Sequence, residues 1–418
     1  MISEDKRQIV DELNKELKDS AIFIANEVPS HGLFPTGIHI IDKAILGGIP
    51  EGRITLLHGR PHGGKSTVAY SAIAEYQKKH PKKLVVYIDT ELAFPTLEED
   101  EDGELKSWAT ILGIDLSRLL IMPTAIVEDV GDSVEFYTGL SKKARELNVG
   151  LVVIDSLAVL KSRDELGKAT GEFMVAGSAK HVSQMITTFL ANQGKRANEG
   201  MDLSTLILIN HQLPSIGGFA PSEDVLPKGR QQLYLSSTRI ELNPYSVAKN
   251  KLTDSENDNG SVFQSKHRMK VKKYRGSGYQ DDVTFILQTL DEGYHPNKCN
   301  YTALANLTKE AKSYGVIKVT DTDKGRVIHI NGLELDIASD AWVEELQLNS
   351  TIVDYISSCI VMIERMRVGR SPLPLDKYIH QWFDVVPPFV YEEFRRMGKV
   401  KQSSRMLNKN KTEVTKGI

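Results

Sequence analysis

The residues whose types and spacing most clearly indicate a chemical function lie in one short segment, Gly59-Arg60-Pro61-His62-Gly63-Gly64-Lys65-Ser66. Its spacing satisfies the pattern G-x-x-x-x-G-K-[ST], the Walker A motif. Glycines at these positions let backbone N–H groups surround a β-phosphate, and the start of a helix adds its positive end. We therefore expect Lys65 to bridge the β- and γ-phosphates of a nucleoside triphosphate, and Ser66 to ligate Mg²⁺, with Thr67 beside them. The alternative is a glycine-rich turn with a chance Lys-Ser, which the predicted strand before the segment and the predicted helix after it disfavour.

Two carboxylates follow predicted strands and complete this hypothesis. Asp155 ends the apolar run Leu151–Ile154, where an aspartate can hold the Mg²⁺ shell in the manner of a Walker B residue. Glu91 lies two residues beyond Asp89, at the end of another predicted strand. The carboxyl ends of parallel strands are where such sheets bind ligands, so Glu91 is a candidate to orient or deprotonate an attacking water. The alternative for Glu91 is a surface glutamate that begins a loop.

These residues need a scaffold, and the surrounding pattern predicts an α/β fold. Continuous apolar runs such as Leu84–Ile88 are typical of strands covered on both faces of a parallel sheet. Helical stretches at 66–79, 131–147 and 172–193 alternate with the strands, which indicates a doubly wound, mainly parallel sheet. The later strands lack long intervening helices and are expected to form an antiparallel extension. The predicted strands are Arg53–His58, Leu84–Asp89, Gly150–Asp155, Thr205–Asn210, Ser237–Leu242, Arg268–Lys273 and Val283–Thr289.

The chain outside this core divides into three further predicted parts. Residues 1–32 read as an amphipathic helix over 2–19 and an apolar linker, which either folds back or docks on another subunit. The core is placed at 33–290, and 291–394 is expected to be a small α/β domain. In that domain we predict a helix at Tyr301–Ser313, a hairpin of Val316–Val319 and Arg326–Ile330, and helices over 338–366 and 389–397. Residues 395–418 form a basic tail.

Composition and charge exclude several classes of protein. Hydrophobic residues make up 40% and charged residues 26% of the 418 residues, as in an ordinary soluble globular protein. Only two cysteines occur, which argues against a disulfide framework and a Cys-rich zinc site and fits a reducing cytoplasm. We see no secretory signal and no apolar run long enough to span a bilayer, so we expect no membrane association and a cytoplasmic location.

The net charge of −3 conceals an uneven distribution. The tail 395–418 contains eight cations and one anion, so it carries +7 while residues 1–394 carry −10. A basic tail on an acidic body favours contact with a polyanion. The alternative is a solvated terminus with no partner.

Several runs in sequence order resemble the RecA recombinase family. They are Pro35-Thr36-Gly37, Asp42, Leu46–Ile54, the Walker A segment, Ile88-Asp89-Thr90-Glu91 and Val153–Leu157. The resemblance covers roughly residues 33–335 and implies a RecA-like P-loop ATPase core. The run Ile209-Asn210-His211 resembles the phage UvsX branch, in which histidine replaces a glutamine.

The resemblance implies further roles at matching positions. Asn210 and His211 would sense the γ-phosphate, although His211 could instead be a buried structural histidine. The stretches Lys161–Gly171 and Gln212–Arg230 would be the first and second DNA-binding loops. On the basic strand 268–275, Lys273 and Arg275 would reach the nucleotide of the neighbouring subunit; the alternative is a solvated cationic edge strand. His295-Pro296 resembles a loop that covers adenine from the neighbouring subunit. The chain departs from the family in three ways: the acidic run Glu98–Asp102 has no counterpart, the tail is basic where the family often has an acidic tail, and residues 336–418 have no match.

The resemblance therefore implies an ATP-dependent DNA recombinase with ATP and Mg²⁺ as cofactors. It would form a homo-oligomeric helical filament on single-stranded DNA and exchange strands with double-stranded DNA. A single-strand-binding protein and a loading factor are further candidate partners, and the location would be the host cytoplasm if the protein is phage-encoded. Two alternatives on the same core are a hexameric replicative helicase and a signalling ATPase that does not bind DNA.

The basic tail generates a prediction about salt. If about three or four of its cations contact phosphates, truncation after Phe394 should reduce the slope of log binding constant against log salt concentration by roughly 2–4. Salt titrations of the full-length and truncated proteins on single-stranded and duplex DNA measure this slope. A full-length variant with these cations changed to glutamine controls for length. An unchanged slope on both DNA forms would instead place the tail on the acidic body of its own chain.

Overall fold

The structure is a computed structural model, and its two compact units, Met1–Pro296 and Asn297–Ile418, are described separately. It describes residues 4–16, 22, 32–95, 98–99, 105–167, 177–213, 226–244, 263–274, 282–290, 293–294, 301–322, 325–331, 333–338, 341–367 and 392. Several predicted features lie outside these ranges. They are Arg275, His295-Pro296, most of the acidic run 98–102, most of the N-terminal linker, residues 168–171 of the first predicted DNA-binding loop, residues 214–225 of the second, and the tail 395–418.

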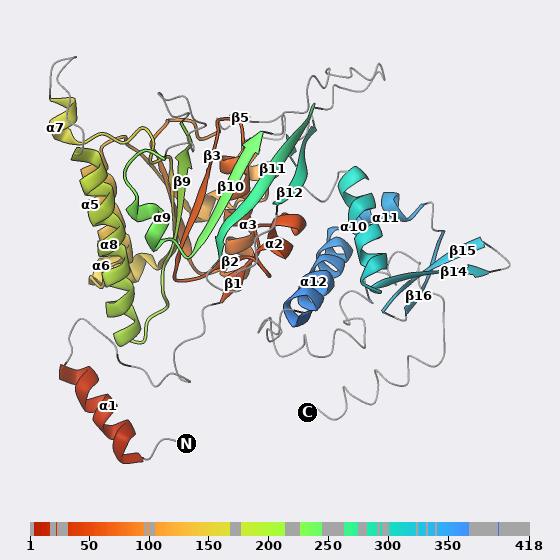
Figure 1. The fold of residues 1–418 in the computed structure, drawn as a ribbon, viewed down its shortest axis with the longest axis horizontal. Coiled ribbons are helices and arrows are strands. Elements are labelled where there is room, and N and C mark those ends of the chain that lie inside the picture. The colour runs from red at the N-terminus through yellow and green to blue at the C-terminus, as the bar shows by residue number, and fades with distance from the viewer. Residues whose placement is uncertain are drawn as a thin grey trace, which may run out of the picture. The chain divides into compact units, whose positions relative to one another are not determined.

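The first unit is built on a nine-stranded sheet among the described residues (Figure 1). Six strands run parallel, in the spatial order β10-β3-β9-β8-β4-β7, and β11, β12 and β13 continue the sheet antiparallel from β10. This confirms the predicted α/β fold with an antiparallel extension. The bounds are β3 Ile54–Gly59, β4 Leu84–Asp89, β7 Leu119–Pro123, β8 Val149–Asp155, β9 Thr205–His211, β10 Thr238–Pro244, β11 Phe263–Tyr274, β12 Asp282–Leu290 and β13 Gly293–Tyr294.

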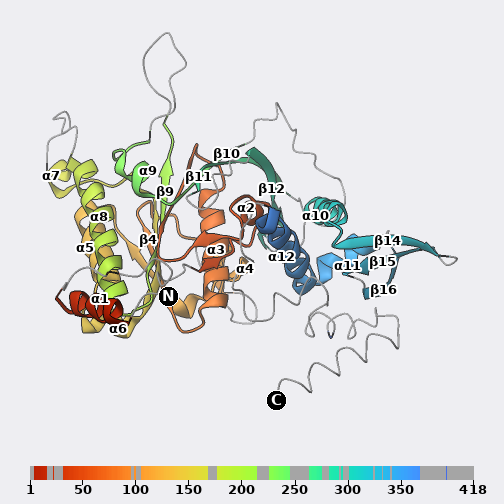
Figure 2. The ribbon, with the colours of Figure 1, turned by 60° about the horizontal axis from the view of Figure 1, so that its bottom comes forward.

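Helices cover both faces of the sheet, which explains its apolar strands (Figures 1 and 2). Successive strand residues point to opposite faces, so Leu57 joins one buried cluster with α3 while Leu56 joins the other with α5 and α8. Each face of the sheet thus has its own core. The helices are α2 His39–Ala44, α3 Lys65–Lys79, α4 Trp108–Ile111, α5 Val127–Thr138, α6 Lys142–Leu147, α7 Arg163–Leu166, α8 Gly177–Asn198 and α9 Gln231–Leu235, with a 3₁₀ turn at Leu116–Arg118.

Smaller elements complete the first unit. The N-terminal helix α1 spans Glu4–Glu16, within the predicted range 2–19. Two short antiparallel pairs lie elsewhere in the chain: β1 Leu33–Phe34 with β2 Ile49–Pro50, and β5 Glu98–Glu99 with β6 Leu105–Lys106. No helix in the described part of the chain is both long and apolar enough to cross a membrane.

One predicted helix is wrong, because 131–147 forms two helices. The helix α5 ends at Thr138, and α6 begins only at Lys142. The Ser141 side chain accepts a hydrogen bond from the Ala144 N–H at 3.1 Å, so it caps a new helix. The edge strand β7 was not predicted; it is short, and burial alternates along it.

In its described residues, the second unit pairs a three-stranded antiparallel sheet with three helices. Its elements are α10 Tyr301–Ser313, β14 Ile317–Thr322, β15 Gly325–Ile330, β16 Leu333–Ala338, α11 Trp342–Leu348 and α12 Ser350–Arg367. The pairing of β14 with β15 confirms the predicted hairpin. Trp342, Tyr355 and Ile356 lie in one buried cluster of this unit.

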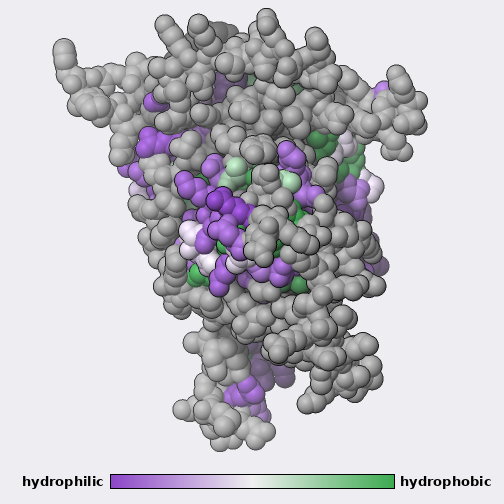
Figure 3. All heavy atoms as spheres, turned by 90° about the vertical axis from the view of Figure 1, so that its right-hand side faces the viewer, coloured by the Kyte–Doolittle hydropathy of each residue, from purple (hydrophilic) through white to green (hydrophobic). Residues whose placement is uncertain are grey.

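The predicted helix over 338–366 is also wrong in part. Residue 338 ends a strand, and Asn349 interrupts the helical stretch, where its side chain accepts from the Ile352 N–H at 3.2 Å. The predicted helix 389–397 lies outside the described residues except for residue 392. On the face of the molecule that Figure 3 shows, the described residues in view are mostly hydrophilic, with a few hydrophobic side chains between them.

Candidate active site

The Walker A segment runs directly from β3 into α3, and two of its glycines are required by packing. A Cβ atom on Gly59 would lie 1.8 Å from the carbonyl oxygen of Leu242, and one on Gly63 would lie 2.2 Å from it. Gly59 and Gly64 also have positive φ angles, 147° and 82°. Only glycine allows the loop to lie this close to the backbone of β10.

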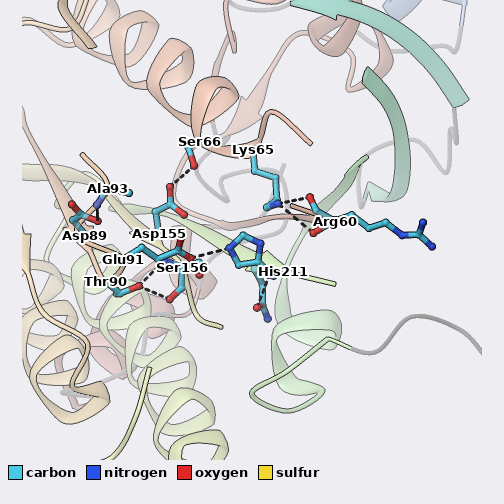
Figure 4. A network of polar contacts seen from close by, with 12 residues as sticks. Arg60, Lys65, Ser66, Asp89, Thr90, Glu91, Ala93, Asp155, Ser156 and His211 are labelled. Atoms are coloured by element: carbon cyan, nitrogen blue, oxygen red, sulfur yellow. Dashed lines mark hydrogen bonds and ion pairs between the residues drawn. The ribbon is translucent and has the colours of Figure 1, made fainter. Parts of the chain in front are cut away.

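Lys65 lies in the first turn of α3, and its ammonium group is held by the loop itself (Figure 4). The Nζ atom donates to the carbonyl oxygens of Arg60 at 2.8 Å and Gly59 at 3.2 Å. Burial lowers the pKa of Lys65 to about 8, against the opposing effect of Asp155 and Glu91. Among the described residues, the partners of this ammonium group at hydrogen-bond distance are backbone carbonyls and not carboxylates.

Ser66 and Asp155 lie side by side, as their predicted role requires. The Ser66 hydroxyl donates to the Asp155 Oδ2 atom at 2.6 Å (Figure 4). Burial raises the pKa of Asp155, while hydrogen bonds from Ser66 and Tyr87 act in the opposite direction. A hydroxyl and a carboxylate are hard oxygen ligands, and Mg²⁺ is commonly bound by one or two carboxylates plus substrate phosphates. The pair therefore fits Mg²⁺, and the described residues contain no larger acidic or histidine cluster that would hold a metal alone.

Glu91 and His211 form the second pair at the site. The Glu91 Oε1 atom accepts from His211 Nε2 at 2.8 Å and from the Ser156 hydroxyl (Figure 4). The His211 bond is the main cause of a lowered pKa at Glu91, and burial opposes it. Glu91 is thus ionised near neutral pH, and because a carboxylate only accepts, the imidazole proton lies on Nε2.

The carboxyl ends of three adjacent strands bring these residues together. Thr90, after β4, and Ser156, after β8, are joined by two hydrogen bonds of 2.7 Å through the Thr90 hydroxyl. The Thr90 N–H also donates to the Asp155 carbonyl oxygen at 2.8 Å. Since β8 also pairs with β9, which ends at His211, the carboxylates and the histidine share one edge of the sheet.

Other predicted residues contact the segments around the site. The Asn210 amide donates to the Pro227 carbonyl at 3.0 Å and to Gln232 at 2.8 Å, near the far end of the predicted second DNA-binding loop. Lys273 donates to the Tyr234 carbonyl at 2.7 Å, at the end of α9, where a cation is favoured. Pro61 and His62 complete the loop, and His62 has a positive φ of 60°.

Two features of the site were missed from the sequence. Tyr87 donates to Asp155 Oδ2 at 2.7 Å; its only sequence signal was a hydroxyl within an apolar strand. Ser178 of α8 also links a residue of each predicted DNA-binding loop. Lys228 Nζ donates to the Ser178 hydroxyl at 2.9 Å, and the Ser178 N–H donates to Glu165 at 2.9 Å. The Ser162–Glu165 capping box was readable from its S-x-x-E spacing.

Comparison with known proteins points to one family. Residues 7–283 match the family model described as RecA N-terminal domain. The chain is 30% identical over 236 residues to Protein RecA of Nostoc sp. (strain PCC 7120), a match that covers 56% of this chain and 58% of that protein. It is 28% identical over 248 residues to Protein RecA of Thermus aquaticus, covering 58% and 66% respectively. The matched region thus spans less than two thirds of the length of these relatives.

The environment of Lys65 predicts that nucleotide binding takes up a proton. The pKa of Lys65 is about 8 in the free protein, and a bound polyphosphate should raise it. At pH 8.5 the amine is largely neutral before binding and charged afterwards, so we expect uptake of more than about half a proton per nucleotide. Calorimetry in buffers of different ionisation enthalpy measures this number.

A Lys65→Arg variant is the matched control, because a guanidinium stays charged throughout this range. Its nucleotide binding should show no such uptake at pH 8.5. Equal uptake by both proteins would assign the proton to another group.

Proposed function

The chain belongs to the RecA family, and from this premise we propose that it is an ATP-dependent DNA recombinase. It would assemble as a filament on single-stranded DNA and promote homologous pairing and strand exchange with double-stranded DNA. The observation that carries the proposal is the convergence of Lys65, the Ser66–Asp155 pair and the Glu91–His211 pair at one edge of the sheet. Of the alternatives, the helicase and the signalling ATPase draw no support from the relatives compared above, which are named Protein RecA.

ATP would be bound through its phosphates. The backbone N–H groups of the loop and the Lys65 ammonium would surround the β- and γ-phosphates. Ser66 and Asp155 would hold Mg²⁺, which neutralises charge on the phosphates when bound. In the free site these two side chains satisfy each other at 2.6 Å, so their oxygens are already directed to one place.

Glu91 would act as the general base for the attacking water. Both of its side-chain donors bond to the Oε1 atom, which fixes the plane of the carboxylate while Oε2 is the atom that would accept the proton. Its lowered pKa keeps it ionised at neutral pH. A correctly placed base of this kind contributes about 10²–10⁴ in rate.

His211 would link this chemistry to DNA. It ends β9 and precedes Gln212, where the predicted second DNA-binding loop begins. Loss of charge on Glu91, or a competing γ-phosphate, would weaken the bond of 2.8 Å that holds the imidazole. Through this bond the occupancy of the nucleotide site would bias the loop. The histidine here is also the basis on which we place the chain nearest the UvsX branch, and a phage origin would locate it in the host cytoplasm.

The test of the function combines hydrolysis with electron microscopy. ATP hydrolysis should rise on addition of single-stranded DNA, and images should show helical filaments with DNA and ATP. A hexameric ring would favour the helicase, and no response to DNA would favour the signalling ATPase. Strand exchange between a circular single strand and a homologous duplex then tests the recombinase itself.

Glu91→Gln should separate binding from hydrolysis. The glutamine keeps the shape of the side chain but cannot accept the proton, so DNA-stimulated hydrolysis should fall by about 10²–10⁴ while ATP binding remains. Lys65→Ala, which loses phosphate binding, is the contrasting control. Hydrolysis by Glu91→Gln at the wild-type rate would rule out the role assigned to Glu91.

Lys273 and Arg275 should act on the nucleotide of a neighbouring subunit. We expect Lys273→Ala and Arg275→Ala to keep nucleotide binding but lose DNA-stimulated hydrolysis, since a cation supplied in trans stabilises transition-state charge. Co-assembly of either variant with Lys65→Ala should recover part of the activity. Lys272→Ala is the control for the loss of one positive charge from β11; the Lys272 ammonium forms an ion pair with Glu241 at 2.7 Å. Mixed filaments with no recovery would contradict a shared site.

A further inference from the structure

A pair of buried tyrosines lies beneath the Asp155 carboxylate. Tyr87, in β4, is 1% exposed, and its hydroxyl is 2.7 Å from Asp155 Oδ2. Tyr70, in α3, is 4% exposed, and its hydroxyl is 3.1 Å from that of Tyr87. A buried hydroxyl without a partner would be costly, so these contacts account for both groups.

Counting protons fixes the direction of this chain of hydrogen bonds. An ionised carboxylate accepts only, and each phenol has one proton to give. Tyr87 gives its proton to Asp155, so the Tyr70 hydroxyl must donate to the Tyr87 oxygen. The chain therefore runs from Tyr70 through Tyr87 to Asp155, and each bond polarises the next.

The two rings have little freedom to move. Tyr70, Tyr87 and Phe94 form a triangle with ring centroids 5.4, 5.5 and 5.8 Å apart. Phe94 is held in turn because its N–H donates to Asp89 Oδ2 at 2.9 Å. The Tyr87 hydroxyl is thus fixed relative to the end of β8, and it can orient whatever it contacts.

The Asp155 Oδ2 atom has two hydroxyl donors of different character. Ser66 lies on the phosphate side and is itself the expected Mg²⁺ ligand, so its bond to Asp155 is available for exchange. Tyr87 lies in the core and has no such second role. Tyr87 is therefore the donor that can stay bonded to the Asp155 carboxylate both with and without bound Mg²⁺.

We propose that Tyr87 is a positioning residue that holds the Asp155 carboxylate in the orientation needed to receive Mg²⁺, with Tyr70 as its support. This inference rests on the proposed function, since it requires a site that binds a nucleotide with Mg²⁺. Partners that orient a metal ligand in this way are typically worth about 10–100-fold in metal affinity.

The experiment measures equilibrium binding of a fluorescent ADP analogue by the full-length protein, without activity as a readout. Binding is recorded in EDTA and then against increasing Mg²⁺. For Tyr87→Phe we expect the Mg²⁺ midpoint to rise by about 10-fold or more, while nucleotide affinity in EDTA stays within about twofold of the wild type. Tyr70→Phe removes only the first hydrogen bond of the series from Tyr70 through Tyr87 to Asp155, so it should shift the midpoint in the same direction by a smaller factor.

Two further variants separate positioning from general packing. Tyr76→Phe removes another buried tyrosine hydroxyl of α3 and should leave the midpoint unchanged. In an Asp155→Asn background, Tyr87→Phe should add no further change, because its effect passes through the carboxylate.

Several results would overturn the proposal. They are unchanged midpoints in both the Tyr87→Phe and Tyr70→Phe variants, an equal loss of nucleotide affinity with and without Mg²⁺, or full additivity with Asp155→Asn. If Tyr87→Phe does not fold, the Tyr70→Phe midpoint alone decides. Failure of the wild-type protein to bind the analogue at all would instead reject the proposed function.

Discussion

Asp155 is 7% exposed, and a carboxylate at such a position must be compensated by its neighbours. Ser66 donates to it from α3 and Tyr87 from β4, while the adjacent peptide groups are tied to Thr90. Ser66 belongs to α3, while Tyr87 and Thr90 belong to β4 and the residue after it, so solvating this one charge fixes the start of α3 and the ends of β4 and β8 relative to each other. The phosphate loop then has a defined place, pressed against the carbonyl of Leu242.

The two carboxylates of the site differ in burial and in the direction of their pKa shifts. Asp155 is held by hydroxyl groups in a buried position, and burial pushes its pKa upward. Glu91 lies nearer the solvent with an imidazole N–H, and its pKa is lowered. The two acids of one site therefore differ in their tendency to carry a proton: Asp155 holds a proton more readily than an ordinary aspartate, whereas Glu91 stays ionised more readily than an ordinary glutamate.

The features that the sequence predicts well are those encoded locally. Strands β4 and β8 were found because they are continuous apolar runs, and the loop of residues 59–66 has a spacing that few other structures share. Ser66 and Asp155 could be assigned to one site in advance because both residues were predicted to bind the same Mg²⁺. In contrast, the short edge strand β7 was missed although its sequence, Leu-Leu-Ile-Met-Pro, is an apolar run, and the end of α5 depends on the competing cap at Ser141. Tyr87 acts on a residue that only the folded sheet places beside it, so no local pattern reveals its role.

Ser178 has a consequence for how this protein can vary. Its hydroxyl is hydrogen-bonded to Lys228 and its N–H to Glu165. One serine in the first turn of α8 thus joins residues of the two predicted DNA-binding loops, 161–171 and 212–230. A change at either partner leaves the other with an altered environment, and substitutions that share a partner are generally non-additive. Glu165 and Lys228 therefore form an epistatic pair across the chain. If one of these loops were replaced by the corresponding loop of a related protein, the partner residue in the other loop, Glu165 or Lys228, would have to be exchanged with it.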